Sequence, residues 1–247
     1  HTVRLMRQWY NEGMKKLLLT SQMIHNTSIA GSLSKLLGKP FSEAKIAYII
    51  TSHNGATGEK SWFVENINSL YNLGWKTFYM IDVAGKDGLP KESWMAQLEE
   101  ADVIAMGGGA NFYLSYWVEK SGLLEQLPRL LETKVYVGAS AGSMLVQPNF
   151  STSSDALREY SHGNWDIDLS LLGPKGRSST RTLQLIDFLI RPHYYSKPSD
   201  FINDKLLREV GTHFKLPIYA LDDDSAVEII GDQIRVISKG RWKFFDL

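Results

Sequence analysis

The chain of 247 residues is 43% hydrophobic and carries 27 basic and 27 acidic side chains, so its formal net charge is zero. This size and composition provide a core for one large α/β domain or two small ones. The charge balance argues against a nucleic-acid or anionic-membrane partner, because both require a basic surface. The absence of cysteine excludes thiol catalysis, disulfides and thiolate metal sites, and fits a reducing cytoplasm.

The first stretch of the chain differs from the rest. Residues 1–13 precede Met14, which looks like a natural start leading into a first strand, and we expect them to be a vector-derived or upstream extension. No run reaches the roughly 18 apolar residues of a membrane span, and the start lacks a secretory-signal pattern. We therefore expect a cytoplasmic protein with a single domain over residues 14–247.

Short buried strands alternate with helical segments along that domain, as in a parallel sheet covered by helices on both faces. Strands are expected at 16–20, 44–51, 77–81, 102–106, 134–138, 185–190, 218–221, 226–230 and 233–237. Helices are expected at 27–37, 59–73, 91–100, 111–121, 123–131, 142–146 and 200–210. Gly231-Asp232 joins the last two strands in a hairpin that extends to 240–245. The predicted class is α/β with a mainly parallel sheet and a C-terminal hairpin.

Three consecutive glycines, Gly107 to Gly109, end the strand at 102–106 and lead into Ala110-Asn111 and a helix. Glycines let a backbone approach a ligand closely and point an N–H group at developing negative charge, as an oxyanion hole requires. The alternative is a phosphate-binding loop. Neither G-x-G-x-x-G nor G-x-x-x-x-G-K-[ST] is present, so nucleotide binding is disfavoured.

The segment 135–144 runs an apolar strand into Gly138-Ala139-Ser140-Ala141-Gly142 and then into a helix-compatible run. This strand–turn–helix pattern is a nucleophile elbow, in which small residues allow a sharp turn and the serine hydroxyl stands exposed at the strand end. The alternative is a Gly/Ser turn between buried elements. A catalytic Ser140 needs further groups to support it.

A base is supplied by His193, which follows the apolar strand at 185–190 and Arg191-Pro192. Of the six histidines it is the best placed, since it stands at another strand end. An imidazole at such a position can take the proton of a serine hydroxyl. The alternative is a solvated loop histidine.

Four motifs in this order resemble the peptidase E family of serine peptidases, the group that contains aspartyl dipeptidase and cyanophycinase. They are Gly107-Gly108-Gly109 before a Phe112-Tyr113-Leu114 helix start, Gly138 to Gly142, the Ser/Thr-rich run from Ser151 to Asp155, and Arg191-Pro192-His193-Tyr194. The resemblance extends from Met14 to the C-terminus. It implies a fold related to class I glutamine amidotransferases, with a serine nucleophile in place of cysteine.

The resemblance also implies roles for single residues. Ser140 is the nucleophile, His193 the general base and Asp155 the acid, and the N–H groups of Gly109 and Ala141 form the oxyanion hole. A serine is a weak nucleophile until an imidazole takes its proton, and a carboxylate stabilises that imidazole when it is charged. Substrate contacts are expected from residues beside these groups: Gly108, Ala110, Asn111 and Tyr194.

The acid has a second candidate in the run Asp222-Asp223-Asp224, which follows the strand at 218–221. Asp223 in particular could replace Asp155, because it too stands at a strand end. The alternative for this run is a solvated turn, the commoner position of a charge cluster.

Two departures from the family pattern concern the substrate. Ala110 stands where the aspartyl dipeptidases have asparagine, and residues 199–205 lack the arginine that recognises an aspartyl side chain. An unpaired carboxylate is expensive to bury, so strict selection for N-terminal aspartate is not expected. Lys197 or Lys205 could compensate only if the loop folds differently. A long stretch between Asp155 and His193, which contains Trp165, is expected to reshape the substrate site.

The combined prediction is a serine peptidase that hydrolyses short peptides near the N-terminus through an acyl-enzyme. No cofactor is expected, and no metal, because the histidines lack H-E-x-x-H spacing. The alternatives are an α/β serine esterase, whose histidine usually lies nearer the C-terminus, and a catalytically silent peptide-binding member of the same fold. The sequence leaves the oligomeric state open, with a homodimer among the states that it allows.

Overall fold

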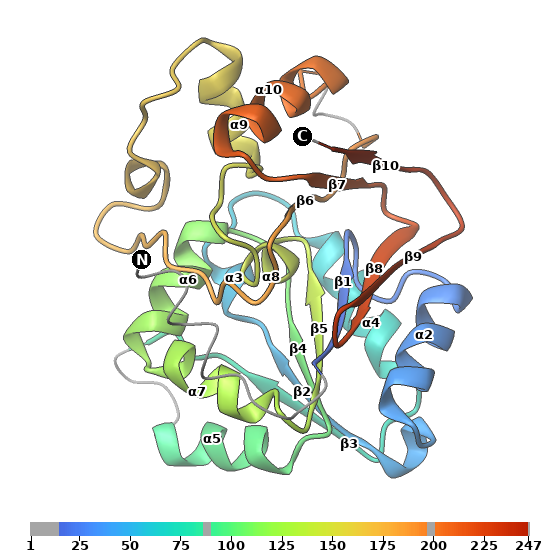
Figure 1. Cartoon of the computed structure of the whole chain (residues 1–247). Coiled ribbons are helices and arrows are strands. Elements are labelled where there is room, and N and C mark those ends of the chain that lie inside the picture. The colour runs from blue at the N-terminus through green and yellow to red at the C-terminus, as the bar shows by residue number, and fades with distance from the viewer. Residues whose placement is uncertain (1–14, 86–89, 197–200, 247) are drawn as a thin grey trace.

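Two β-sheets form the framework of the chain, and the computed structural model describes residues 15–85, 90–196 and 201–246 of it. The expected extension at 1–13 lies outside these residues. The strands are β1 (Lys16–Thr20), β2 (Lys45–Ile49), β3 (Thr77–Ile81), β4 (Val103–Met106), β5 (Val135–Ala139), β6 (Leu189–Arg191), β7 (Ile218–Leu221), β8 (Ser225–Ile230), β9 (Gln233–Ser238) and β10 (Trp242–Phe245). Seven of them form one sheet in the order β3-β2-β4-β5-β1-β8-β9, and three form a second sheet in the order β10-β7-β6 (Figure 1).

Most of the large sheet is parallel. Strands β1 to β5 pair only in parallel with one another, whereas β8 pairs antiparallel with β1 and β9 antiparallel with β8. The predicted α/β class with a mainly parallel sheet is confirmed, and so is the hairpin turn at Gly231-Asp232 between β8 and β9. β1 therefore lies inside the sheet, between β5 and β8.

Helices cover both faces of this sheet (Figure 1). They are α2 (Thr27–Leu37), α3 (Thr51–Asn54), α4 (Ser61–Tyr71), α5 (Lys91–Glu100), α6 (Asn111–Lys120), α7 (Leu123–Leu130), α8 (Ala141–Met144), α9 (Ser154–Ser161) and α10 (Asp204–Phe214), with 3-10 turns η2 (Phe41–Glu43) and η3 (Leu169–Leu172). Apolar residues of α5, α6 and α7 belong to one buried cluster, and those of α2 and α4 to another.

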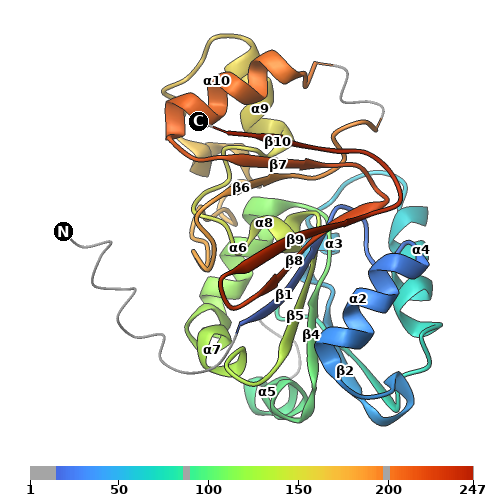
Figure 2. The ribbon, with the colours of Figure 1, turned by 45° about the vertical axis from the view of Figure 1, so that its right-hand side comes forward.

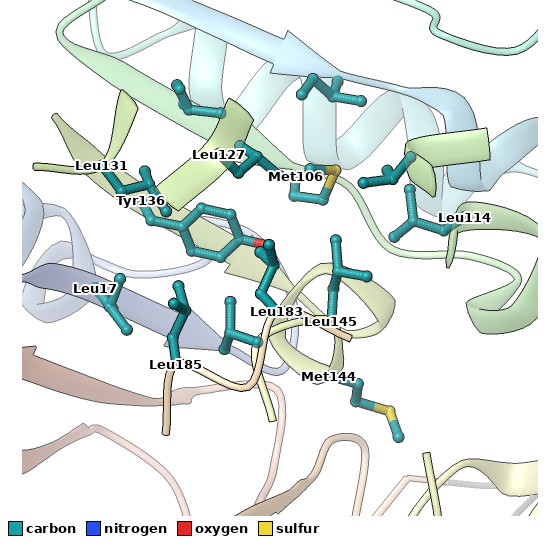
Figure 3. Close-up of a cluster of buried hydrophobic side chains, with 14 of the residues drawn as sticks. Leu17, Met106, Leu114, Leu127, Leu131, Tyr136, Met144, Leu145, Leu183 and Leu185 are labelled. Atoms are coloured by element: carbon teal, nitrogen blue, oxygen red, sulfur yellow. The ribbon is translucent and has the colours of Figure 1, made fainter. Parts of the chain in front are cut away.

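Each strand contributes alternate side chains to the two clusters. In β1, Leu17 and Leu19 face the α5–α7 side, while Leu18 faces the α2 side. This follows from the two-residue repeat of a strand, and it explains why strands buried on both faces read as continuous apolar runs. Figure 3 shows the first cluster, in which Tyr136 of β5 lies among leucine and methionine side chains such as Leu127 and Met106.

The small sheet has a core of its own. β7 pairs in parallel with β6 and antiparallel with β10, and α9 and α10 lie over this sheet (Figure 2). Leu157 of α9 and Leu207 of α10 pack with Leu189 and Ile218 in a third buried cluster. The sequence predicted that the C-terminal hairpin would extend to residue 245. Instead the chain leaves β9 and adds β10 to the small sheet.

Several element boundaries differ from the sequence prediction for local reasons. The strand expected at 185–190 is confined to Leu189–Arg191, because Leu183 and Leu185 donate their N–H groups to Leu145 and Val146 beyond α8. The helix expected at 200–210 begins at Asp204, where the Asn203 side chain caps it by accepting the Leu206 N–H. Helix α9 was not expected, and Ser153 caps it through the Ala156 N–H.

No helix in the described parts of the chain combines the length and apolarity that crossing a bilayer requires.

One buried hydrogen bond ties the core to the turn after β5, and its removal should be measurable. Tyr136 is fully buried, and its hydroxyl donates to the carbonyl of Gly142 at 2.7 Å. Tyr136→Phe keeps the ring but leaves this buried carbonyl without its hydrogen-bond donor. We therefore expect the free energy of unfolding to fall by about 1–3 kcal/mol. Urea denaturation measures it. Tyr71→Phe, at an exposed site, is the matched control, and an equal loss in both variants would refute the assignment.

Candidate active site

Four of the features selected from the sequence stand at strand ends where the two sheets meet. Ser140 follows β5 and the glycine loop follows β4, both in the large sheet, whereas His193 follows β6 and Asp223 follows β7 in the small sheet. The ends of β1, β4 and β5 in Figures 1 and 2 point toward the small sheet. Carboxyl ends of parallel strands are where open α/β sheets place their ligand sites.

Ser140 has the conformation expected of a nucleophile elbow. Its φ of 48° and ψ of −107° lie in a region that side-chain-bearing residues rarely adopt. Two hydrogen bonds hold it there, from the Ser140 N–H to Thr20 and from the Met144 N–H to Ser140, both at 3.0 Å. The turn also needs small neighbours, since a Cβ on Gly142 would lie 2.2 Å from the carbonyl oxygen of Met106. Packing of α8 against β4 therefore maintains the strained serine.

The glycine loop approaches Ser140 directly. A Cβ on Gly108 would lie 3.1 Å from the Ser140 Cβ, and one on Gly109 would lie 2.4 Å from the carbonyl oxygen of Ser52. Gly109 also has a φ of 135°, which excludes most other residues. Within the described residues the N–H groups of Gly108, Gly109 and Ala141 make no hydrogen bond. These free donors lie on both sides of Ser140 in the chain.

His193 forms a close pair with Asp223. The His193 Nδ1 atom lies 2.5 Å from Asp223 Oδ1, and the two side chains are 38% and 31% exposed, so the pair remains open to a substrate. Two hydroxyl groups also donate to this carboxylate, Ser21 to Oδ1 at 2.9 Å and Ser196 to Oδ2 at 2.8 Å. With Nδ1 facing Asp223, the other ring nitrogen of His193 is left for chemistry.

The Asp223 carboxyl is held in its ionised form. Partial burial acts to raise its pKa, but the hydrogen bond and charge of His193, together with the hydroxyls of Ser196 and Ser21, outweigh it and hold the pKa well below its usual range. An ionised carboxylate can only accept hydrogen bonds, so His193 carries its proton on Nδ1. This is the tautomer in which Nε2 can accept a proton.

The carboxylate preferred from the sequence, Asp155, lies elsewhere. It is exposed in the first turn of α9, and among the described residues it makes no hydrogen bond to His193. Partial burial raises the pKa of the Asp155 carboxyl against the opposing charge of Arg158, one turn along the same helix. The structure thus brings His193 together with the alternative acid, Asp223, because β6 and β7 are adjacent strands whereas α9 lies outside them.

Ser140 and His193 are connected through the end of β1. Thr20 accepts the Ser140 N–H, and the next residue, Ser21, accepts the His193 N–H at 2.7 Å. The Ser140 hydroxyl makes no hydrogen bond in the described structure. Catalytic hydrogen bonds are commonly long in a free enzyme and shorten when substrate binds.

The residues expected to contact substrate divide into two groups. Gly108, Ala110 and Asn111 follow one another at the start of α6, and the Asn111 Oδ1 atom is buried without a hydrogen-bond partner among the described residues. Tyr194 does not face the site. It is 7% exposed and packs in the small-sheet core, where its hydroxyl donates to Asp204.

The stretch between Asp155 and His193 packs partly against α9 and α10 and partly against α6. Trp165 stacks on Tyr160 with ring centroids 4.8 Å apart, and also contacts His213 of α10. A later part of this stretch follows α6, where the Ser179 N–H donates to Phe112 at 3.1 Å. Lys205 is 86% exposed and pairs with Glu209 on the same helix, and Lys197 lies outside the described residues.

No group of three or more His, Cys, Asp or Glu side chains suited to a metal ion occurs in the described parts of the chain.

A family model, that of peptidase family S51, matches residues 17–237. The chain belongs to peptidase family S51. Among curated proteins, this S51 chain is 29% identical over 145 residues to peptidase E of Streptomyces coelicolor, covering 56% of the chain and 53% of that relative. It is 26% identical over 142 residues to an uncharacterized peptidase of Listeria monocytogenes, covering 56% and 61% respectively. The chain thus matches roughly half to three-fifths of the length of these relatives.

Solved structures share the fold of this S51 chain. A crystal structure from Listeria monocytogenes EGD-e, named as a candidate peptidase E, superimposes with a TM-score of 0.71 at 21% identity, over 92% of this chain and 100% of that one. A peptidase from an acI-B1 Actinobacterium gives 0.59 at 13% identity, over 94% of each chain. At these identities the likeness concerns the fold alone.

His53 was not expected at the site from the sequence, and it packs against the glycine loop. His53 is 1% exposed in α3, and a Cβ on Gly107 would lie 2.3 Å from its Cε1 atom. Its Nδ1 lies 2.7 Å from the carbonyl of Ile50 and its Nε2 lies 3.3 Å from the Tyr48 hydroxyl. One donor and one acceptor is the pattern of a neutral ring. An apolar strand followed by Ser-His at 52–53 was the signal in the sequence.

His53 should make the stability of this S51 chain depend on pH. Burial, assisted by the positive charge of Lys60, lowers the pKa of His53 to about 4 against the opposing hydrogen bond to Ile50. An unfolded histidine takes up its proton near pH 6.5. The unfolded state therefore binds more protons between these values, and we expect the free energy of unfolding to fall by up to about 3 kcal/mol as the pH drops from about 6.5 to about 4.

Urea titrations at several pH values measure this slope. His53→Gln removes the titrating ring and should flatten the slope in that range. His162→Gln, at an exposed turn, should leave it unchanged. The same slope in the wild type and in His53→Gln would show that other groups cause it.

Proposed function

We propose that the chain is a serine peptidase that hydrolyses short peptides near their N-terminus through an acyl-enzyme. One arrangement of groups carries the proposal. Ser140 is strained at a strand–turn–helix, and the backbone N–H groups of Gly109 and Ala141 make no hydrogen bond in the described residues. A His193–Asp223 pair stands at the ends of two strands of the adjoining sheet. These are the parts that acyl transfer requires: nucleophile, base, orienting carboxylate and oxyanion donors. Membership of a peptidase family supports the same reaction class.

In the first half-reaction, the Ser140 oxygen attacks the carbonyl carbon of the substrate while His193 Nε2 takes its proton. The carbonyl oxygen becomes negatively charged and accepts hydrogen bonds from the N–H groups of Gly109 and Ala141. Asp223 stabilises the imidazolium and fixes its orientation. The C–N bond then breaks, and the leaving amine receives the proton from His193.

The second half-reaction repeats these steps with water as nucleophile. His193 takes a proton from water as the oxygen attacks the ester carbon of the acyl-enzyme. When the tetrahedral intermediate collapses, the C–O bond to Ser140 breaks and the proton passes from His193 to the serine oxygen. The free carboxylate product and the resting enzyme result.

Ser140→Ala tests the nucleophile. Removing a triad member costs on the order of 10⁴ to 10⁶ in turnover, and a hydroxyl on a turn contributes little to packing, so the variant should fold normally and be inactive. The measurement is hydrolysis of a dipeptide library, with folding followed by circular dichroism. Ser34→Ala, an exposed site on α2, should keep full activity. More than a few per cent of residual activity in Ser140→Ala would exclude this serine as the nucleophile.

A pair of isosteric variants tests the acid. Asp223→Asn removes the charge opposite His193 and favours the wrong imidazole tautomer, and we expect turnover to fall by about 10⁴-fold. Asp155→Asn, on the exposed turn of α9, should change turnover by less than about threefold. Both are compared by kcat on the same peptide. The reverse ranking would return the acid role to Asp155.

The surroundings of the site argue against strict selection for aspartate at the first substrate position. Ala110 offers only a methyl group, and Lys205 is solvated beside Glu209. A pocket discriminates strongly for a carboxylate only when its own polar groups would be left unpaired without one. The buried, unpartnered Asn111 Oδ1 is an acceptor and suits a substrate N–H group rather than a carboxylate.

A matched series of dipeptides that differ only in the first residue tests this expectation. We expect kcat/KM for Asp-Xaa to exceed that for neutral first residues by no more than about tenfold, because neither Ala110 nor the solvated Lys205 places a fixed cation beside the substrate carboxylate. Asn111→Ala should lower kcat/KM for all members of the series alike. An aspartate preference of about a thousandfold, equivalent to about 4 kcal/mol, would require a cation at the site and contradict the proposal.

A further inference from the structure

Ser21 is a buried residue that has no part in the proposed reaction steps, and it contacts both His193 and Asp223. It follows β1 immediately and has no exposed surface. Its side chain lies 172 residues from His193 and 202 residues from Asp223 in the sequence, yet it touches both. In the described parts of the chain, no other side chain hydrogen-bonds to both of these residues.

The protons at Ser21 can be assigned from the geometry. The backbone N–H of His193 donates to the Ser21 oxygen at 2.7 Å, and the Ser21 hydroxyl donates to Asp223 Oδ1 at 2.9 Å. A hydroxyl has one proton to give, and the Nδ1 proton of His193 goes to Asp223 at 2.5 Å. The Ser21 Oγ atom lies 3.4 Å from His193 Nδ1. This contact is therefore not a hydrogen bond, and it arises because both groups donate to the same Asp223 oxygen.

Both groups that Ser21 holds need support. His193 has a φ of 55°, a left-handed conformation that a side-chain-bearing residue adopts only when its surroundings impose it. The Asp223 carboxylate carries a charge that requires donors, and Ser21 and Ser196 supply one for each oxygen. The Ser196 hydroxyl binds only the carboxylate, and it is the backbone N–H of Ser196 that donates to the His193 carbonyl at 3.3 Å. The Ser21 hydroxyl also binds the backbone N–H of His193.

Ser21 itself is anchored to the large sheet. Its N–H donates to Ser225 at the start of β8, and the preceding residue, Thr20, accepts the N–H of Ser140. The end of β1 thus fixes the position of the imidazole through Ser21 and the position of Ser140 through Thr20. Without Ser21, the described contacts between β1 and His193 would be lost.

We propose that Ser21 is a positioning residue of the active site, whose hydroxyl orients the His193 ring toward Ser140 by binding the His193 backbone and the Asp223 carboxylate at the same time. This inference rests on the proposed peptidase function for its kinetic test. Its spectroscopic test does not depend on turnover.

The kinetic test compares Ser21→Ala with Ser196→Ala. Each variant removes one donor to Asp223, but only Ser21→Ala also releases the His193 backbone. Misplacing a catalytic base slows the chemical step more than it weakens binding, so Ser21→Ala should lower kcat by about 10- to 100-fold with KM changed less than about twofold. Ser196→Ala should lower kcat by less than about fivefold, since one neutral donor is lost. Ser21→Thr keeps the hydroxyl and should recover most of the activity.

The spectroscopic test follows the Nδ1 proton of His193 by NMR. A proton held between an imidazole and a carboxylate gives a low-field resonance, which is assigned by its loss in Asp223→Asn. It should broaden or move upfield in Ser21→Ala and stay in place in Ser196→Ala. If the wild type hydrolyses no peptide, the proposed function fails, but this comparison still tests the role of Ser21.

Wild-type kcat together with an unchanged resonance in Ser21→Ala would overturn the inference. If Ser21→Ala does not fold, Ser21→Cys fills the same space with a poor hydrogen-bonding group and takes its place in both tests. An equal loss in Ser21→Ala and Ser196→Ala would also overturn it, because the backbone contact of Ser21 would then contribute nothing. A proportional rise in KM would indicate a substrate-binding role instead and count against it.

Discussion

The carboxyl end of strand β1 is the constraint to which the candidate site is tied. Thr20 is fully buried between β5 and β8, and its carbonyl accepts both the Ser140 N–H and the Ser143 hydroxyl. Its own hydroxyl donates to Gly138 at the end of β5. Because strands flank β1 on both sides, its end cannot shift without breaking a ladder. The end of β1 therefore positions Ser140 directly and His193 through Ser21.

The second requirement is close backbone packing around the serine. The Ser52 hydroxyl donates to the carbonyls of both Gly107 and Gly108, at 2.9 Å and 2.6 Å, and thereby fixes the backbone of the loop. Ala110 in turn donates to the Ser52 carbonyl. Donors fixed in this way need no reorganisation when charge develops beside them, and this preorganisation is the main source of electrostatic catalysis. The glycines are thus needed to let the loop backbone lie close to Ser52 and Ser140 as much as for their flexibility.

The small sheet supplies the other half of the constellation. Its strands β6 and β7 are parallel neighbours, with Arg191 paired to Ala220, so the residues two positions beyond each strand end meet as His193 and Asp223. Tyr194 anchors the histidine loop on the opposite side, where its hydroxyl and Lys243 of β10 both bind Asp204 on α10. The imidazole is therefore held from the large sheet by Ser21 and from the small sheet by its neighbour.

Sequence alone determined the features with local causes. Apolar runs identified strands β1 to β5, and the spacing of small residues around Ser140 identified the elbow, because both depend on neighbours along the chain. The acid was different. An acidic run at 222–224 and a lone Asp155 look alike as solvated charges, and only the pairing of β6 with β7 brings Asp223 to His193. The contacts of Ser21 and the pairing of β10 in the second sheet could not be predicted from the sequence either. These contacts join residues far apart in the chain, and no local pattern encodes which distant hydroxyl or strand edge will become a neighbour once the sheets have formed.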